Sequence, residues 1–182
     1  MISRERTQNI IIASTIIVAI ISSTFLVSNA TYYAGTYTLL GRFSITFEEL
    51  IISDLDPLDN TTEPHLQFRF NIATDSQYKG NVRITFMGFT PTLNYDELSY
   101  TPFSIVLPVD EQYLTPNYTR ELMFNNTASD ELGIDRQTIW DAYESGIWFW
   151  QVEFRYSYIF FDAIGTVDFA YQNFNITEVT II

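Results

Sequence analysis

The sequence has no cysteine and only one histidine, His65, among 182 residues. The lack of thiols excludes disulfides, cysteine nucleophiles and thiolate metal sites. A Ser-His-Asp site would depend on His65, and the chain has no Gly-x-Ser-x-Gly motif to support one. His65 follows Glu63-Pro64 at the start of a predicted strand, where a solvated loop-edge residue is the simpler interpretation and a base or ligand the alternative. We therefore expect a protein that is not an enzyme.

Basic residues are also scarce. Nine Lys and Arg oppose 22 Asp and Glu, which gives a net charge of −13. Residues 1–30 hold two of the arginines and one glutamate, so the remainder carries seven basic and 21 acidic residues, a net charge of −14. Such a field repels phosphate groups, because phosphate contacts from Lys and Arg supply most nucleic-acid affinity. Nucleic acid is excluded as a partner, and the acidity serves either solubility or cation binding.

One long hydrophobic run is present, the 18 residues from Ile10 to Val27, and it follows Arg4 and Arg6. As a helix it would span roughly 27 Å, close to the ~30 Å hydrocarbon layer of a bilayer. An uncleaved anchor is the favoured interpretation, with the N-terminus cytoplasmic because positive charge stays inside. The small residues of Ser28-Asn29-Ala30 also fit a signal-peptidase site, so a cleaved leader is the alternative.

This topology divides the chain into four segments. They are a cytoplasmic n-region (1–9), a transmembrane helix or signal anchor (10–28), a linker (29–39) and an extracytoplasmic domain (40–182). The chain is long enough for one domain with a full core.

Five Asn-x-Ser/Thr sequons are consistent with export, since glycans require exposed asparagines in a translocated protein. Their acceptors are Asn29, Asn60, Asn117, Asn125 and Asn175. The alternative is an Asn- and Thr-rich composition without glycosylation.

From residue 36 onward, apolar and polar residues alternate with period two, which predicts a β protein. Residues 65–74 and 80–89 are expected to form a hairpin around the turn residues 75–80, and a bulge is expected at Glu48-Glu49. Further strands are predicted at 100–109, 118–124, 147–161, 164–171 and 173–182. One short helix is predicted near Asp135–Ser145, ended by Gly146. The fold class is mainly β, an antiparallel two-layer β-sandwich of about eight strands with one short helix, preceded by a single N-terminal transmembrane helix.

This order of elements, with a strand running into Phe70-Asn71-Ile72-Ala73-Thr74-Asp75, resembles the water-stress-hypersensitive, type 2 late-embryogenesis-abundant sandwich over residues 40–182. That family typically has Asn-Pro after the second strand, whereas Ile72 follows Asn71 here. The resemblance implies a binding or protective module. Archaeal surface β-sandwich proteins with one N-terminal membrane helix, including stator-like components of motility filaments, look similar at the same coarse level.

Two candidate sites emerge from the sequence. Asp54, Asp56, Asp59 and Asn60 form an acidic loop whose mutual repulsion a Ca²⁺ ion would relieve, although a solvated turn explains the same residues. No other cofactor is expected. In the aromatic strand 147–161, Ile147 and Phe149 could project outward as a surface for a partner or glycan, or the strand could be buried on both faces.

We therefore expect a membrane-anchored, acidic, glycosylated β-sandwich of the cell envelope that binds an envelope protein or glycan without catalysis. The alternatives are a carboxylate-based hydrolase of surface glycans and a subunit of a surface filament or membrane complex.

Overall fold

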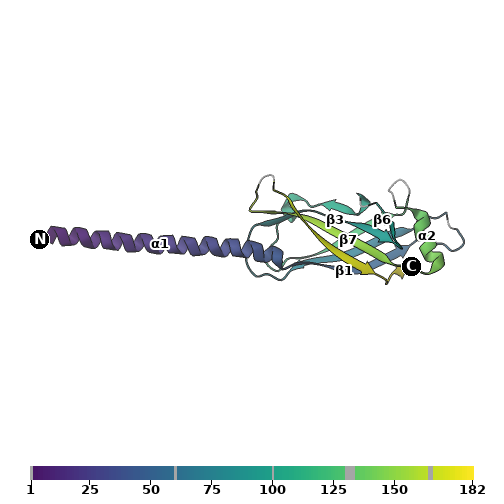
Figure 1. Ribbon diagram of the computed structural model, residues 1–182, viewed down its shortest axis with the longest axis horizontal. Coiled ribbons are helices and arrows are strands. Elements are labelled where there is room, and N and C mark those ends of the chain that lie inside the picture. Colours follow the sequence, from purple (N-terminus) through teal and green to yellow (C-terminus); the bar gives the residue numbers. More distant parts are fainter. Residues whose placement is uncertain (1, 60, 100, 130–133, 164–165) are drawn as a thin grey trace.

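A computed structural model describes residues 2–59, 61–99, 101–129, 134–163 and 166–182. A long helix projects from one end of a β-sandwich (Figure 1). The elements in chain order are α1 (Ile2–Gly41), β1 (Phe43–Ser53), β2 (His65–Thr74), β3 (Val82–Leu93), β4 (Asp96–Glu97), η1 (Thr101–Phe103), β5 (Ser104–Val106), η2 (Val109–Glu111), β6 (Thr119–Thr127), α2 (Arg136–Ser145), β7 (Trp150–Phe160), β8 (Asp168–Ile176) and β9 (Thr180–Ile181).

Two sheets form the sandwich. One has the strand order β6-β2-β1-β9 and the other β4-β3-β7-β8, with β5 also paired to β3. All pairs are antiparallel except β1 with β9, which is parallel. The predicted fold class, a mainly β two-layer sandwich with one short helix behind an N-terminal helix, is confirmed.

The core between the sheets is rich in aromatic side chains. Strand β2 alternates strictly, and its inward-facing Leu66, Phe68, Phe70 and Ile72 are all completely buried. Opposite them lie the equally buried rings of Phe89, Phe154 and Trp150. Period-two alternation produces this result because successive strand side chains point to opposite faces.

Two local predictions are confirmed. The register between β1 and β2 shifts between Phe47 and Glu49, which is the expected bulge. Helix α2 begins after Asp135, whose carboxylate accepts a hydrogen bond from the Gln137 N–H, and it ends at Gly146 with φ 68°. Aspartate at the N-cap and glycine in the left-handed C-terminal position are the usual helix boundaries.

Three strand predictions are wrong. Of the strand predicted at 100–109, only β5 (Ser104–Val106) is extended among the described residues, and η1 and η2 flank it. Strands β2 and β3 do not form a hairpin: they belong to different sheets, and the turn between them crosses from one layer to the other. Near the C-terminus, β8 runs without interruption through residues that we had divided between two strands. Its nine residues pair continuously with β7 from Asp168 to Ile176, and this ladder outweighs the local turn propensity of the Asn and Gln residues.

The segment 29–39, expected to be a linker, is helical, because α1 continues to Gly41. Its last turns pack into the sandwich, where Thr36 and Leu39 are completely buried. The Thr36 hydroxyl oxygen accepts a hydrogen bond from the Asn81 N–H (2.9 Å), and the Thr74 hydroxyl donates to the Leu39 carbonyl (2.9 Å). These contacts join the helix rigidly to the domain.

Candidate functional site

The N-terminal helix is the first functional feature. The stretch Arg4–Gly41 contains an 18-residue window with a mean hydropathy of 2.6, and none of that window is buried within the protein. Its isoleucines and Phe25 are therefore exposed. A helix of this length and composition can cross a membrane, and the apolar part of a signal sequence has the same properties.

Helix α2 lies at the end of the sandwich opposite α1 (Figure 1). Exposed apolar side chains lie beyond its C-terminal end. Of the two predicted partner residues, Ile147 is 60% exposed and Phe149 is half-buried. The Phe149 ring contacts Tyr95, which is 81% exposed, at 5.8 Å between centroids. The Asn94 side chain ties this region together, donating to the Ile147 carbonyl (2.8 Å) and accepting from the Phe149 N–H (3.1 Å). We call Tyr95, Ile147 and Phe149 the distal tip.

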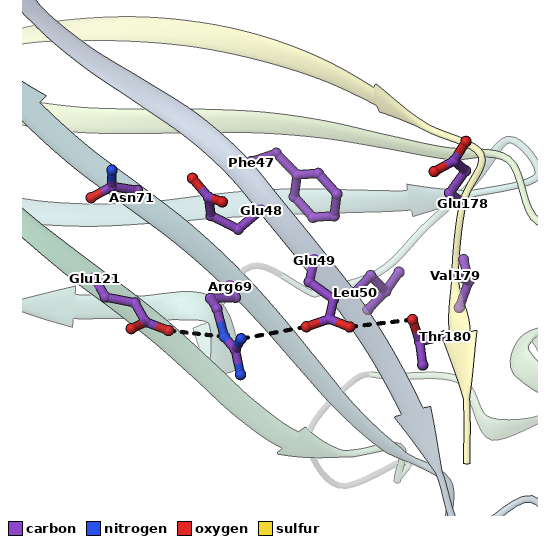
Figure 2. Close-up of a pocket in the computed structure, with 10 residues that line it drawn as sticks. All are labelled: Phe47, Glu48, Glu49, Leu50, Arg69, Asn71, Glu121, Glu178, Val179 and Thr180. Carbon is purple, nitrogen blue, oxygen red and sulfur yellow. Dashed lines mark hydrogen bonds and ion pairs between the residues drawn. The ribbon is translucent and has the colours of Figure 1, made fainter.

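A groove of 660 Å³ lies on the outer face of the β6-β2-β1-β9 sheet (Figure 2). Its lining residues are Phe47, Glu48, Glu49, Leu50, Arg69, Asn71, Glu121, Glu178, Val179 and Thr180. Arg69 forms ion pairs with Glu121 (2.9 Å) and Glu49 (3.4 Å), and the Thr180 hydroxyl donates to Glu49 (3.3 Å). Glu49 stands directly opposite Arg69 across the β1–β2 pair.

This groove bears on the hydrolase alternative. Glycoside hydrolysis needs two carboxyl groups that face each other across the substrate bond. Figure 2 shows the Arg69 guanidinium between Glu49 and Glu121. The two ion pairs link neighbouring strands, since Glu49 is on β1, Arg69 on β2 and Glu121 on β6. Sequence reasoning did not find the groove, because its charged residues come from three strands whose pairing was unknown.

His65 is the first residue of β2 and is half-buried. Its Nδ1 lies 3.5 Å from the Thr127 hydroxyl on the neighbouring strand β6. The imidazole thus lies at the beginning of an inner strand, half-buried rather than fully solvated, and it does not line the groove.

The structure does not gather the carboxylates of the acidic loop into one cluster. Asp56 accepts a hydrogen bond from the Leu58 N–H (2.9 Å), Asp59 accepts from Thr61, and Asp54 accepts from Ser53 (3.1 Å). Hydrogen bonds from the Thr61 hydroxyl and N–H hold the pKa of Asp59 below its ordinary value. Asn60 lies outside the described residues. Among the residues that are described, no three His, Asp or Glu side chains form a group suited to a metal ion.

We expect millimolar Ca²⁺ to leave the melting temperature of the protein unchanged, since Asp56 and Asp59 already accept backbone hydrogen bonds within their own turns and Asp54 accepts one from the Ser53 hydroxyl. Thermal unfolding with Ca²⁺, with Mg²⁺ and with chelator checks this expectation. A rise in melting temperature that is specific to Ca²⁺ and disappears in Asp56→Ala would contradict this expectation and support a calcium site in the loop.

Three of the predicted glycosylation asparagines are exposed. Asn117 lies in a turn with φ 55°, Asn125 on β6 and Asn175 on β8. Asn29 lies within α1, where its side-chain amide donates to the Phe25 carbonyl (3.0 Å). The fifth acceptor, Asn60, is outside the described residues.

Fold and site together define the class: a two-layer β-sandwich carried on an N-terminal apolar helix of membrane-spanning length. No protein-family model matches the sequence, and no curated protein matches it. Similar solved structures include a Bordetella pertussis protein assigned to ApaA, with 9% identity, a TM-score of 0.46 and coverage of 74% of this chain and 92% of that one. A protein from Archaeoglobus fulgidus shares 9% identity at a TM-score of 0.40, covering 75% of this chain and 94% of that one. These neighbours are β-rich proteins and assign neither a family nor an activity.

Proposed function

We propose that the chain is an uncleaved, single-pass membrane protein that displays a non-catalytic binding or structural module outside the cytoplasm. Its partner is another protein or a glycan of the cell envelope, and the distal tip is the contact surface.

The observation that carries this proposal is the continuity of α1 with the sandwich. The helix runs unbroken through Ser28-Asn29-Ala30, where a peptidase would require an unwound backbone, and one face of its final turns, with Thr36 and Leu39, is buried in the domain. A membrane helix fixed in this way holds the sandwich upright and directs the distal tip away from the bilayer (Figure 1). The charge distribution agrees, since the two N-terminal arginines favour a cytoplasmic N-terminus.

Exposed aromatic and aliphatic groups at the distal tip are suited to docking. Tyrosine and phenylalanine are enriched where proteins meet partners, because they bury a large area at low entropic cost. Asn94 holds the backbone of Ile147 and Phe149 in place, and the Phe149 ring packs against the exposed Tyr95 ring. A preorganised surface of this kind loses little freedom on binding.

Affinity purification of the full-length protein from native membranes tests the proposal. We expect a stoichiometric envelope component to co-purify with the wild type and to be lost with the double variant Tyr95→Glu/Ile147→Glu. The control is the double variant Val106→Glu/Val109→Glu, which adds the same two charges at residues that are 73% and 68% exposed on β5 and η2, away from the tip.

Orientation is measured in the same membranes by adding protease to sealed, right-side-out vesicles. Digestion of the sandwich from outside agrees with the proposed topology. Protection of the sandwich, or a partner retained equally by the tip variant and the control, would contradict the proposal.

A further inference from the structure

Five aromatic side chains gather where α1 meets the sandwich. They are Tyr32, Tyr33 and Tyr37 of α1 together with Phe160 and Phe161 at the end of β7, and we call them the aromatic collar. Ring centroids lie 4.7 Å apart for Tyr33 and Phe161 and 4.9 Å apart for Tyr37 and Phe160. The three tyrosines remain 42–58% exposed. The collar thus forms a surface rather than a closed core.

Phe161 reaches the collar through an unfavourable backbone conformation. Phe161 and Asp162 have φ values of 54° and 51°, a left-handed conformation that is rare and unfavourable for a bulky residue such as Phe161. Asp162 compensates by accepting hydrogen bonds from Asn81 (2.6 Å) and Tyr113 (3.1 Å) and by pairing with Arg83 (3.2 Å). The Asn81 bond, the largest contribution, holds the pKa of Asp162 below its ordinary value. The surroundings therefore force the turn to hold the Phe161 ring against α1.

The part of the collar nearest the apolar run lies at the outer edge of a membrane interface. Tyr32 and Tyr33 follow Val27, the end of the apolar run, by five and six residues, a rise of about 8–9 Å along the helix, whereas Tyr37 lies about 15 Å beyond Val27. A bilayer has a ~30 Å hydrocarbon layer within a total of ~40–45 Å, so a headgroup layer about 5–8 Å thick begins near the end of the run. Because helical side chains point back toward the N-terminus, the Tyr32 and Tyr33 rings reach into this layer. Tyrosine and tryptophan are enriched at this depth, where an apolar ring with a polar group is solvated on both sides.

We propose that the aromatic collar is a lipid-contact surface that seats the sandwich on the interfacial zone of a phospholipid bilayer. The proposal rests on the proposed membrane anchoring and extends it. Through the collar, Phe160 and Phe161 at the end of β7 would contact the same bilayer that α1 crosses. None of the five collar side chains is charged.

Fluorescence quenching in phosphatidylcholine vesicles tests this with the full-length protein and single added tryptophans. Phe161→Trp reports on the collar from the sandwich, and Tyr33→Trp reports on it from α1. Phe25→Trp lies in the apolar run and reports on anchoring, while Tyr95→Trp at the distal tip is the matched control. The native tryptophans lie in α2 and at the start of β7, at the distal end, and supply a constant background.

A nitroxide on the lipid headgroup is expected to remove at least half of the emission added by Phe161→Trp and by Tyr33→Trp. It should leave the emission of Tyr95→Trp unchanged. A nitroxide at the centre of the acyl chains should quench Phe25→Trp most strongly.

The outcomes separate the two proposals. If Phe25→Trp is quenched while both collar probes behave like Tyr95→Trp, the lipid-contact proposal is overturned and the anchor stands. If Phe25→Trp is not quenched, the anchor itself fails. A third outcome is that the nitroxide does not quench the collar probes but their emission changes when the protein is diluted in lipid. This would assign the surface to contact with a second copy of the chain and would likewise overturn the proposal.

Discussion

Replacing Phe70 by alanine is expected to lower the free energy of unfolding by about 3–5 kcal/mol, the usual range for removing a buried phenylalanine ring. Phe70 on β2 is completely buried. Its ring lies within 6.2 Å, between centroids, of five other phenylalanine rings from both sheets: Phe47, Phe89, Phe124, Phe154 and Phe174. Neighbours held by two hydrogen-bonded sheets cannot collapse into the space, so the lost contacts are not replaced.

Denaturant unfolding of the full chain in detergent micelles measures the effect, with near-ultraviolet circular dichroism as the probe of core packing. Phe169→Ala is the control, because Phe169 is 54% exposed on β8 and its removal leaves no cavity. We expect that control to change stability by less than about 1 kcal/mol. Equal losses for the two variants would mean that the Phe70 cluster does not hold the sheets together.

The role of Phe70 could be predicted in part from the sequence. Alternation in 65–74 indicated which side chains of β2 face inward, because the side-chain period of a strand is two whatever its partner. The bulge after Phe47 and the limits of α2 were also predictable, since each depends on residues within a few positions along the chain.

Strand partners were not predictable in the same way. The turn residues after Thr74 permit a hairpin, but β2 pairs with β1 and β6 while β3 pairs with β7. Pairing depends on which faces close over a common core, and local turn chemistry contains no information about that. The groove around Arg69 was missed for the same reason.

Only the α1 side chains of the aromatic collar could have been predicted from the sequence. Tyr33 and Tyr37 are four residues apart on one helix face just beyond an apolar run, which is the signal of an interfacial aromatic belt. Residues 31–39 are rich in Thr and Tyr, which favour β structure, yet they are helical. Burial of Thr36 and Leu39 against the sandwich outweighs that local propensity. Phe161 lies more than 120 positions away along the chain and joins the collar only through the fold.

Replacing Gly80 by alanine is expected to loosen the joint between α1 and the sandwich and to cost about 1–3 kcal/mol or more, as overpacked sites do. A Cβ at Gly80 would lie 2.4 Å from Thr36 Cα and 2.5 Å from Thr36 N. Both are backbone atoms of α1, and no rotamer change relieves the overlap. The loop must move away from the helix, which breaks the hydrogen bond from the Asn81 N–H to the Thr36 hydroxyl oxygen.

Gly41→Ala is the matched control, because a Cβ at Gly41 meets nothing within 4 Å. Hydrogen exchange should show faster exchange at Asn81 in Gly80→Ala and an unchanged rate in Gly41→Ala. Because Asn81 also holds Asp162, and Asp162 fixes the turn at Phe161, the same variant should weaken lipid quenching at the collar. Faster exchange at Asn81 with unchanged quenching would show that the α1–sandwich joint and the collar are independent. Faster exchange together with weaker quenching would show that this one contact sets the angle between the sandwich and α1.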